Sequence, residues 1–165
     1  MVHRLGAFPP PRRLPEGYGI RTATSNDAAR LAVLLSHAFL EEWDESRVRS
    51  LLLDHPDVPV TLVVDFDERI VATASYQVFP RDFPDSGWVH YVGADPAHAG
   101  IGLGYSITRA VLAESVNRRK TDVRLTTDDW RLSAIRTYLN LGFEPDLWHE
   151  SHKDRWSAVL NELRT

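Results

Sequence analysis

The chain reads Val89-His90-Tyr91-Val92-Gly93-Ala94-Asp95-Pro96-Ala97-His98-Ala99-Gly100-Ile101-Gly102-Leu103-Gly104 near its middle. This run predicts a buried strand that passes through a glycine-dense loop into a helix, which we expect from about Tyr105 to Arg119. The alternating glycines carry no Cβ atoms, so they leave the backbone N–H groups of the loop unobstructed. The helix aims its positive N-terminal end at the same place. The run therefore predicts a cradle for the phosphates of a nucleotide, a dinucleotide or coenzyme A.

Two common phosphate-binding loops do not match this run. A P-loop closes on Gly-Lys-Ser/Thr, whereas Gly104 is followed here by Tyr105 and Ser106. A dinucleotide fingerprint places Gly-x-Gly-x-x-Gly on the first strand-to-helix turn, whereas this chain has Gly-x-Gly-x-Gly after three earlier predicted strands. These differences argue against a P-loop and against a dinucleotide-binding loop, and the choice of ligand depends on the surrounding residues.

Hydrophobic periodicity on either side of the loop predicts the remaining elements. Strands are expected over 19–23, 61–66, 69–79, 88–94, 123–127 and 143–148, with a hairpin turn at 67–68. Helices are expected after a cap at Ser25 or Asn26, after Asp44, over 132–141 with Gly142 as C-cap, and after a capping box at Ser151. The order β-α-α-β-β-β-α-β-α-β plus a C-terminal helix predicts an α/β (α+β) fold. We expect a mixed, mostly antiparallel sheet of six to seven strands with helices on both faces.

Composition limits the class of protein. The 165 residues suit a single domain, which we place over 18–165, after a proline-rich N-terminal arm over 1–17. The absence of cysteine excludes a thiolate nucleophile, a cysteine zinc site and a disulfide scaffold. The net charge of −4, with scattered basic residues, makes nucleic acid an unexpected partner. No apolar run is long enough for a membrane span and no signal peptide is visible, so we expect a cytoplasmic protein without membrane association.

Two strings together resemble one known family. The run from Val92 to Gly104 resembles the coenzyme A loop of the GCN5-related N-acetyltransferases (GNAT), usually Val-x-Pro-x-x-Arg-Gly-x-Gly-x-Gly. The run from Ala134 to Phe143 resembles the second signature of that family, Ala-x-x-x-Tyr-x-x-x-Gly-Phe. The run Gly-x-Val-x-x-Val-Gly-x-Asp-Pro over 87–96 is also similar to the C-terminal half of the mycothiol synthases, which have two such domains where this chain has one. The resemblance implies the GNAT fold.

The resemblance also implies how acetyl-CoA would bind, with CoA as a product. Family members polarise the thioester with backbone groups near the end of the strand before the glycine loop, by position Val92, Gly93 and Ala94. The loop residues then take the pyrophosphate, by position Ala99, Gly100, Ile101, Gly102, Leu103, Gly104 and Tyr105. Ala99 stands where the family usually has Arg or Gln, and Arg131 stands where it often has Asn. We expect Arg131 to replace the missing cation from the other side of the cleft.

Two side chains are expected to move protons. Tyr138 aligns with the tyrosine that many family members use as general acid toward the thiolate, although its position on the helix also fits an aromatic of the core. The strand position that often carries a glutamate base is Trp88. Period-two geometry puts His90 on the same face as Trp88 and Val92, so we expect His90 to be the base. The alternative is a core histidine, with water or an acceptor-loop residue as base.

The acceptor side is less defined. Family members build it from two segments that correspond here to 39–43 and 79–85, both of which mix aromatic residues with carboxylates. Trp148, His149, His152 and Trp156 either close the pocket or pack in the core, and no metal site is expected. The function expected is direct acetyl transfer to a small-molecule amine or a peptide amino-terminus. The alternatives are an acyl-CoA-binding or regulatory module without catalysis and a structural protein that dimerises by sheet extension. A homodimer is compatible with the sequence.

Overall fold

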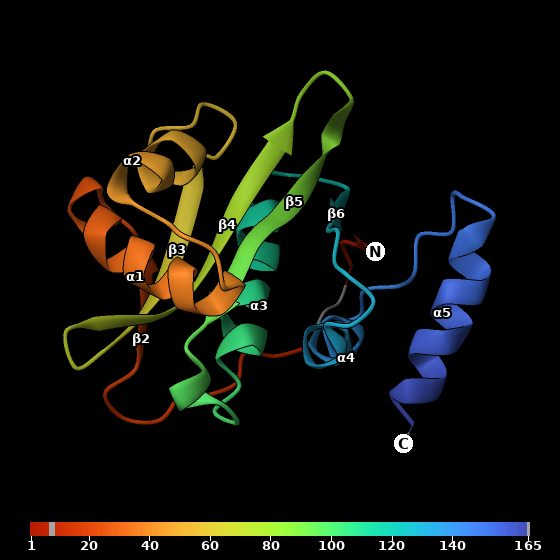
Figure 1. Cartoon of the computed structure of the whole chain (residues 1–165). Helices are drawn as coiled ribbons and strands as arrows, with labels where there is room; N and C mark the ends of the chain where they lie inside the picture. Colours follow the sequence, from red (N-terminus) through yellow and green to blue (C-terminus); the bar gives the residue numbers. More distant parts are fainter. Residues whose placement is uncertain (7–8, 165) are drawn as a thin grey trace.

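The protein is built on one six-stranded sheet with the strand order β1-β6-β5-β4-β3-β2 (Figure 1). The computed structural model describes residues 1–6 and 9–164. The strands are β1 (Val2–Arg4), β2 (Gly19–Thr22), β3 (Val60–Phe66), β4 (Arg69–Phe79), β5 (Phe83–Ala94) and β6 (Asp122–Arg124). Neighbouring strands are antiparallel except β5 and β6, which are parallel. The predicted mixed, mostly antiparallel sheet is confirmed.

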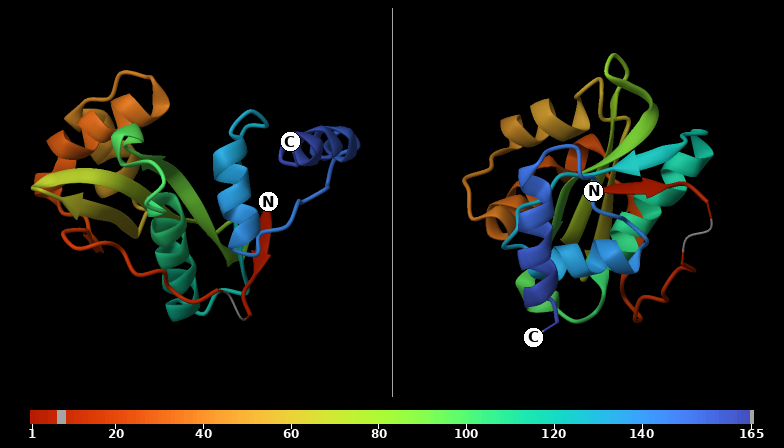
Figure 2. Two further views of the ribbon diagram at one scale, coloured as in Figure 1. Left: turned by 90° about the horizontal axis from the view of Figure 1, so that it is seen from below. Right: turned by 90° about the vertical axis from the view of Figure 1, so that its right-hand side faces the viewer.

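Helices cover both faces of the sheet, as predicted (Figure 2). The helical segments are η1 (Ser25–Asp27), α1 (Ala28–Phe39), α2 (Glu45–Val48), its continuation η2 (Arg49–Leu53), η3 (Pro96–His98), α3 (Leu103–Asn117), α4 (Leu132–Asn140) and α5 (Ser151–Glu162). α1 and α2 lie on one face, α3 lies on the other, and α5 lies outside α4 (Figure 1). None of the helices in the described part of the chain combines the length and hydrophobicity that a membrane span requires.

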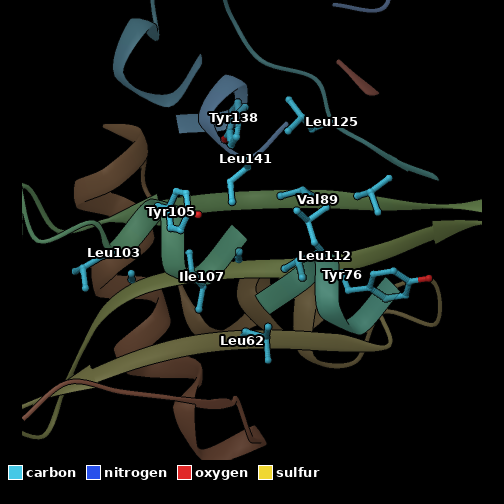
Figure 3. Close-up of a cluster of buried hydrophobic side chains, with 14 of the residues drawn as sticks. Leu62, Tyr76, Val89, Leu103, Tyr105, Ile107, Leu112, Leu125, Tyr138 and Leu141 are labelled. Carbon is cyan, nitrogen blue, oxygen red and sulfur yellow. The ribbon is translucent and has the colours of Figure 1, made fainter. Parts of the chain in front are cut away.

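Each face of the sheet has its own core. On the α1 side, Leu31 and Leu35 of α1 pack with Leu52 of η2 and with Val63 of β3. On the α3 side, the buried residues come from α3, α4 and the central strands, and they include Leu62, Tyr76, Val89, Ile107, Leu112, Tyr138 and Leu141 (Figure 3). Figure 3 shows Tyr138 and Leu141 reaching from α4 towards the sheet. The second core therefore fixes α3 and α4 beside the end of β5.

The predicted hairpin between β3 and β4 is confirmed. Its two turn residues, Asp67 and Glu68, both have left-handed backbones with φ of 48° and 61°. Two successive left-handed residues match the right-handed twist of the strands that they join. This tight turn sets the first pairs, Phe66↔Arg69 and Asp65↔Ile70, after which the register shifts by one residue between Asp65 and Val64.

The start of α1 is held by a buried carboxylate. Asp27 accepts hydrogen bonds from Arg21 Nη1 at 2.7 Å and from the Thr24 N–H at 2.7 Å, and it also bonds Arg30. The Arg21 guanidinium holds the pKa of Asp27 well below its usual range. The expected cap at Ser25 or Asn26 is wrong, because the cap is Thr24 and the reciprocal bonds are made by Asp27.

The two ends of the chain depart from the prediction at the sheet edge. Residues 2–4, expected within an arm, form β1 and pair with β6, and the Met1 ammonium donates to the Leu125 carbonyl at 2.8 Å. The strand expected over 143–148 does not form. Glu144 makes only a single bridge, to Val2. β1 already occupies the edge of β6, and Pro145, which lacks an N–H, cannot extend the ladder beyond Glu144.

The C-terminal elements agree with the prediction in part. Gly142 follows α4 with φ of 93°, as expected of a residue that ends a helix in the left-handed conformation. The capping box at Ser151 is wrong. The Ser151 hydroxyl bonds the His149 ring at 2.9 Å, and the Ser151 N–H also donates to that ring at 3.2 Å. Glu150 is the N-cap of α5, and the His149 ring before it accepts from the first N–H of the helix.

Candidate active site

The site begins where β5 and β6 separate. The two strands pair only from Ser86↔Asp122 to Trp88↔Arg124, after which β6 ends while β5 continues to Ala94. On its other edge β5 stays paired with β4, as at Ala72↔Ala94. The edge of β5 beyond Trp88 that faces away from β4 therefore has no strand partner in the described chain. Its backbone groups can bond a ligand.

A β-bulge at Tyr91 sets the direction of the side chains in this part of β5. His90 pairs with Ser75 and Gly93 with Thr73, so β5 has one extra residue there, and Tyr91 has φ of 46°. Tyr91 packs in the α1-side core, whereas Val92 packs in the α3-side core. The expectation that His90 and Val92 share a face is wrong, because the extra residue breaks the period of two.

The glycine loop has the backbone geometry of an anion cradle. Gly100 and Gly102 have φ of 82° and 83°, and Gly102 is the N-cap of α3. A Cβ atom at Gly100 or Gly104 would meet no other heavy atom within 4 Å, so the space beside both residues is open. Asp95 holds the preceding turn, since its carboxylate accepts from the Ala97 N–H at 2.9 Å. The loop and the first turn of α3 therefore fit a diphosphate.

A cleft of about 800 Å³ connects this loop with α1 and α4. Most of the predicted cofactor-binding residues line it, namely Val92, Gly93, Ala94, Ala99, Gly100, Gly102, Leu103, Gly104, Tyr105 and Arg131. Tyr138 lines it as well. Ile101 is not among the lining residues and packs instead against the α3-side core. The structure thus brings the two signature strings together around one cleft.

Tyr138 combines a core position with access to the cleft. Only 6% of its surface is exposed, and its ring lies edge-on to Phe143 at 5.9 Å between centroids. Burial raises the pKa of Tyr138 to about 12, although the nearby charge of Arg131 acts in the opposite direction. The phenol is therefore protonated at neutral pH, so it can donate a hydrogen bond into the cleft.

Arg131 and His90 lie in different surroundings. Arg131, at the start of α4, has its guanidinium carbon 5.1 Å from the Phe39 ring centroid and 5.6 Å from that of Trp130, so it spans from α4 towards α1. His90 does not line the cleft and lies against Tyr91, with 4.1 Å between ring centroids. Burial, together with the charge of His55, lowers the pKa of His90 to about 4. His90 is therefore neutral at pH 7.

Of the two segments expected to form the acceptor side, 39–43 contributes to the cleft and 79–85 does not. Phe39, Leu40 and Glu41 line the cleft, together with Trp130 and Asp128, which the sequence did not single out. The 79–85 segment is the turn between β4 and β5, where Phe79 pairs with Phe83, and it does not line the cleft. The aromatic and histidine side chains of 148–156 do not line it either.

The proline-rich segment contributes a residue that the sequence analysis missed. Arg12 lines the cleft, and its guanidinium carbon lies 3.8 Å from the centroid of the Tyr105 ring. The signal available in the sequence was indirect, because Ala99 leaves the loop without its usual cation. Nothing in the periodicity of 9–16 predicts that this segment passes the loop.

In the part of the chain that the structure describes, histidines and carboxylates do not gather into a metal site. Within residues 1–6 and 9–164, no group of three or more His, Cys, Asp or Glu side chains is placed to hold an ion. The rings of His149 and His152 lie 5.7 Å apart, but their Nδ1 atoms bond the Ser151 hydroxyl and the Asp146 carbonyl. Both rings are therefore held by hydrogen bonds around the start of α5.

Comparisons with known proteins agree with this geometry. Mycothiol acetyltransferase from Salinispora arenicola (strain CNS-205) is 33% identical over 172 aligned positions, which cover 98% of this chain and 52% of the relative. The chain therefore spans about half the length of that relative. Two solved structures share the fold. One is the ribosomal-protein-S18-alanine N-acetyltransferase from Escherichia coli, with a TM-score of 0.67, 19% identity, and coverage of 78% of this chain and 79% of that chain.

The other is an aminoglycoside acetyltransferase from an uncultured soil metagenomic sample in complex with sisomicin. Its TM-score is 0.64 at 16% identity, with coverage of 81% of this chain and 93% of that chain. At such low identities, these two structures bear on the fold alone. The model of the Acetyltransferase (GNAT) family matches residues 28–143, which include both signature strings and the cleft-lining residues other than Arg12. The chain belongs to the acetyltransferase (GNAT) family.

Proposed function

We propose that the chain is an acetyl-CoA-dependent N-acetyltransferase that passes the acetyl group directly to a small amine or a peptide amino-terminus. The observation that carries the proposal is that one cleft is lined by both the glycine loop and Tyr138. The end of β5, whose edge is no longer paired with β6, lines the same cleft. This arrangement would hold the phosphates and the thioester of one extended molecule. The family match and the relatives named as acetyltransferases support the same reaction.

The donor end is built largely from main chain. The N–H groups of the loop from Ala99 to Tyr105 would bond the diphosphate, and the backbone of Val92, Gly93 and Ala94 would orient the pantetheine and polarise the carbonyl. When bound, acetyl-CoA supplies an activated acyl group with a thiolate as leaving group. No covalent enzyme intermediate is required, and the chain contains no cysteine that could form one.

Tyr138 would donate the proton that the departing thiolate needs. A buried phenol with a pKa of about 12 is protonated at neutral pH, but it is a weaker acid than a thiol, whose pKa is about 8.5, so proton transfer to the departing sulfur atom requires a short, well-aligned hydrogen bond. Tyr138 also packs on Phe143, which holds its ring in one orientation. Its core role and its role as acid are therefore compatible.

His90 is the proposed base for an acceptor that approaches β5 from the α1 side. A pKa of about 4 leaves the imidazole neutral and able to accept a proton at physiological pH. The low pKa also makes it a weak base, so it suits an amine that already binds partly neutral. The acceptor would lie close to Phe39 and Glu41, which form the α1 wall of the cleft, and because His90 does not line the cleft it would take the proton through a water molecule.

The proposal is tested by a binding measurement followed by an activity assay. Acetyl-CoA at about 100 times its Kd should stabilise the protein by about 2.7 kcal/mol in thermal unfolding. A panel of amines and peptide amino-termini, followed by thiol release, should then identify a turnover-competent acceptor. No stabilisation by acetyl-CoA or CoA at any concentration would contradict the proposal at its first step.

The second candidate function is an acyl-CoA-binding or regulatory module that lacks catalysis. Trp88 occupies the position where a glutamate base is often found, and Ala99 lacks the usual cation. Such a module would be stabilised by acetyl-CoA but would release no thiol with any acceptor. The same two measurements therefore separate the module from the enzyme.

A further inference from the structure

The proline-rich segment is tied to the domain at both of its ends. Near its start, the Pro9 carbonyl accepts from Arg109 Nε at 2.8 Å and the Pro10 carbonyl accepts from the Tyr105 hydroxyl at 3.5 Å, both from α3. Near its end, the Tyr18 hydroxyl bonds the His98 ring at 2.7 Å. The segment passes beneath α3 on its way to β2 (Figure 1). It therefore holds a fixed course past the glycine loop.

Arg12 lies between these two anchors, against the loop. Its guanidinium stacks on Tyr105, and its Nη1 atom lies 3.9 Å from the place that a Cβ atom would take at Gly102. Tyr105 stands in the first turn of α3, and Gly102 is the N-cap of that helix. The cation is thus placed beside the N–H groups that fit a diphosphate.

The charges around Arg12 leave its guanidinium available. Within residues 1–6 and 9–164, no carboxylate forms an ion pair with Arg12. The other arginine that lines the cleft is Arg131, which contacts Phe39 and Trp130 at the α1 and α4 end. Position 99 in the loop is alanine. Arg12 is therefore the arginine that the described chain supplies at the loop end.

We propose that Arg12 binds the diphosphate of the acyl-CoA donor and replaces, from a segment about ninety residues earlier in the chain, the cation absent at position 99. A guanidinium can donate two parallel hydrogen bonds to phosphate oxygens, and stacking on Tyr105 already limits its freedom. The inference rests on the proposed function, since it assigns a donor-binding residue to the same cleft.

Arg13 offers a matched control for the test. It is the same residue type one position later, is exposed, and does not line the cleft. We expect Arg12→Ala to raise the Kd of CoA at least about tenfold in calorimetry, as for a lost charge-assisted hydrogen bond. Arg13→Ala should leave that Kd within about twofold. The difference between the two variants should shrink as salt rises, because both side chains are exposed to solvent.

Two analogues of CoA locate the contact. 3′-Dephospho-CoA keeps the diphosphate and should lose the same factor as CoA in Arg12→Ala, whereas pantetheine, which has no phosphate, should inhibit both proteins equally. An effect on CoA that disappears with 3′-dephospho-CoA would overturn the assignment to the diphosphate. Equal Kd values for Arg12→Ala and Arg13→Ala would overturn any role of Arg12. Wild-type protein that binds neither CoA nor its analogues would instead refute the proposed function itself.

Discussion

The two ends of the cleft are built from different parts of the polypeptide. The donor end consists of main chain, with left-handed Gly100 and Gly102 leading into α3. The opposite end consists of side chains, notably Phe39 and Trp130, each of which lies against the guanidinium of Arg131 between α1 and α4. A backbone N–H group is kept when a side chain is substituted, whereas a wall made of side chains changes with each substitution. The donor can therefore be inferred from geometry more directly than the acceptor.

The largest effect is expected from filling the main-chain end. Gly104→Leu places a side chain into open space within the first turn of α3, so it should abolish saturable CoA binding. The helix itself should not lose stability, because leucine has a higher helix propensity than glycine by roughly 1 kcal/mol. Calorimetry with CoA and thermal unfolding without ligand would check the two halves of this expectation.

Gly19→Leu is the control for that variant. A Cβ atom at Gly19 also meets nothing within 4 Å, but Gly19 lies in β2 at the edge of the sheet and does not line the cleft. Its CoA affinity should match that of the wild type. Wild-type affinity in Gly104→Leu would show that the donor does not use the loop.

The next largest effect is expected at Tyr138, which lies between the main-chain end and the side-chain end of the cleft. Tyr138→Phe removes one hydroxyl and should lower kcat by about 10³-fold, within the range for proton transfer by a positioned side chain. The Kd of CoA should change little, since the ring and its packing on Phe143 are kept. Steady-state kinetics with calorimetry would separate these quantities. An unchanged kcat would leave Tyr138 with its packing role alone.

A smaller effect is expected at His90. Because burial lowers its pKa to about 4, the wild-type rate should rise with pH up to about pH 4 and then level off, if chemistry limits the rate. His90→Gln should lower the plateau by about 10²-fold, at the lower end of the range for a positioned proton acceptor, and should remove the acidic limb. The measurement is a pH–rate profile of both proteins. The same limb in the mutant would exclude His90 as the base.

The smallest effect tests which end of the cleft Arg131 serves. The sequence predicted that Arg131 serves the donor, and on that prediction Arg131→Ala should raise the Kd of CoA several-fold, less than Arg12→Ala. Its contacts with Phe39 and Trp130 place it close to the side-chain end. A change confined to the KM of the acceptor would move Arg131 to the acceptor side and sharpen the division between the two ends.

The parts of the fold that depend on neighbouring residues in the chain could be predicted from the sequence. Left-handed turn residues set the β3–β4 hairpin, and the glycine run sets the entry into α3. The bulge at Tyr91 could not be read from periodicity, since one inserted residue alters the face of every position after it. The pairing of β1 with β6 joins segments that are far apart in the chain, and neither composition nor local periodicity reveals such a long-range pairing.

The residues of the candidate site also differ in whether the local sequence could predict them. The residues near the glycine loop follow from consecutive positions in the chain, and nearly all of them line the cleft. Arg12 and Trp130 reach it only because distant segments are folded against the loop and α4. His90 was expected on one face with Val92 beside the cleft, but the bulge that follows His90 turns Val92 to the other face, and His90 does not line the cleft.

The buried carboxylate of Asp27 makes one wall of the cleft sensitive to acid. Its pKa is depressed by Arg21, so its contribution to the free energy of unfolding is complete above about pH 4, the ordinary pKa of aspartate, and declines as the pH falls further. The helix that it anchors ends in Ala38 and Phe39, which line the cleft. Loosening of this helix below about pH 4 would therefore impair the acceptor wall, whereas the glycine loop, which leads into α3, does not depend on Asp27.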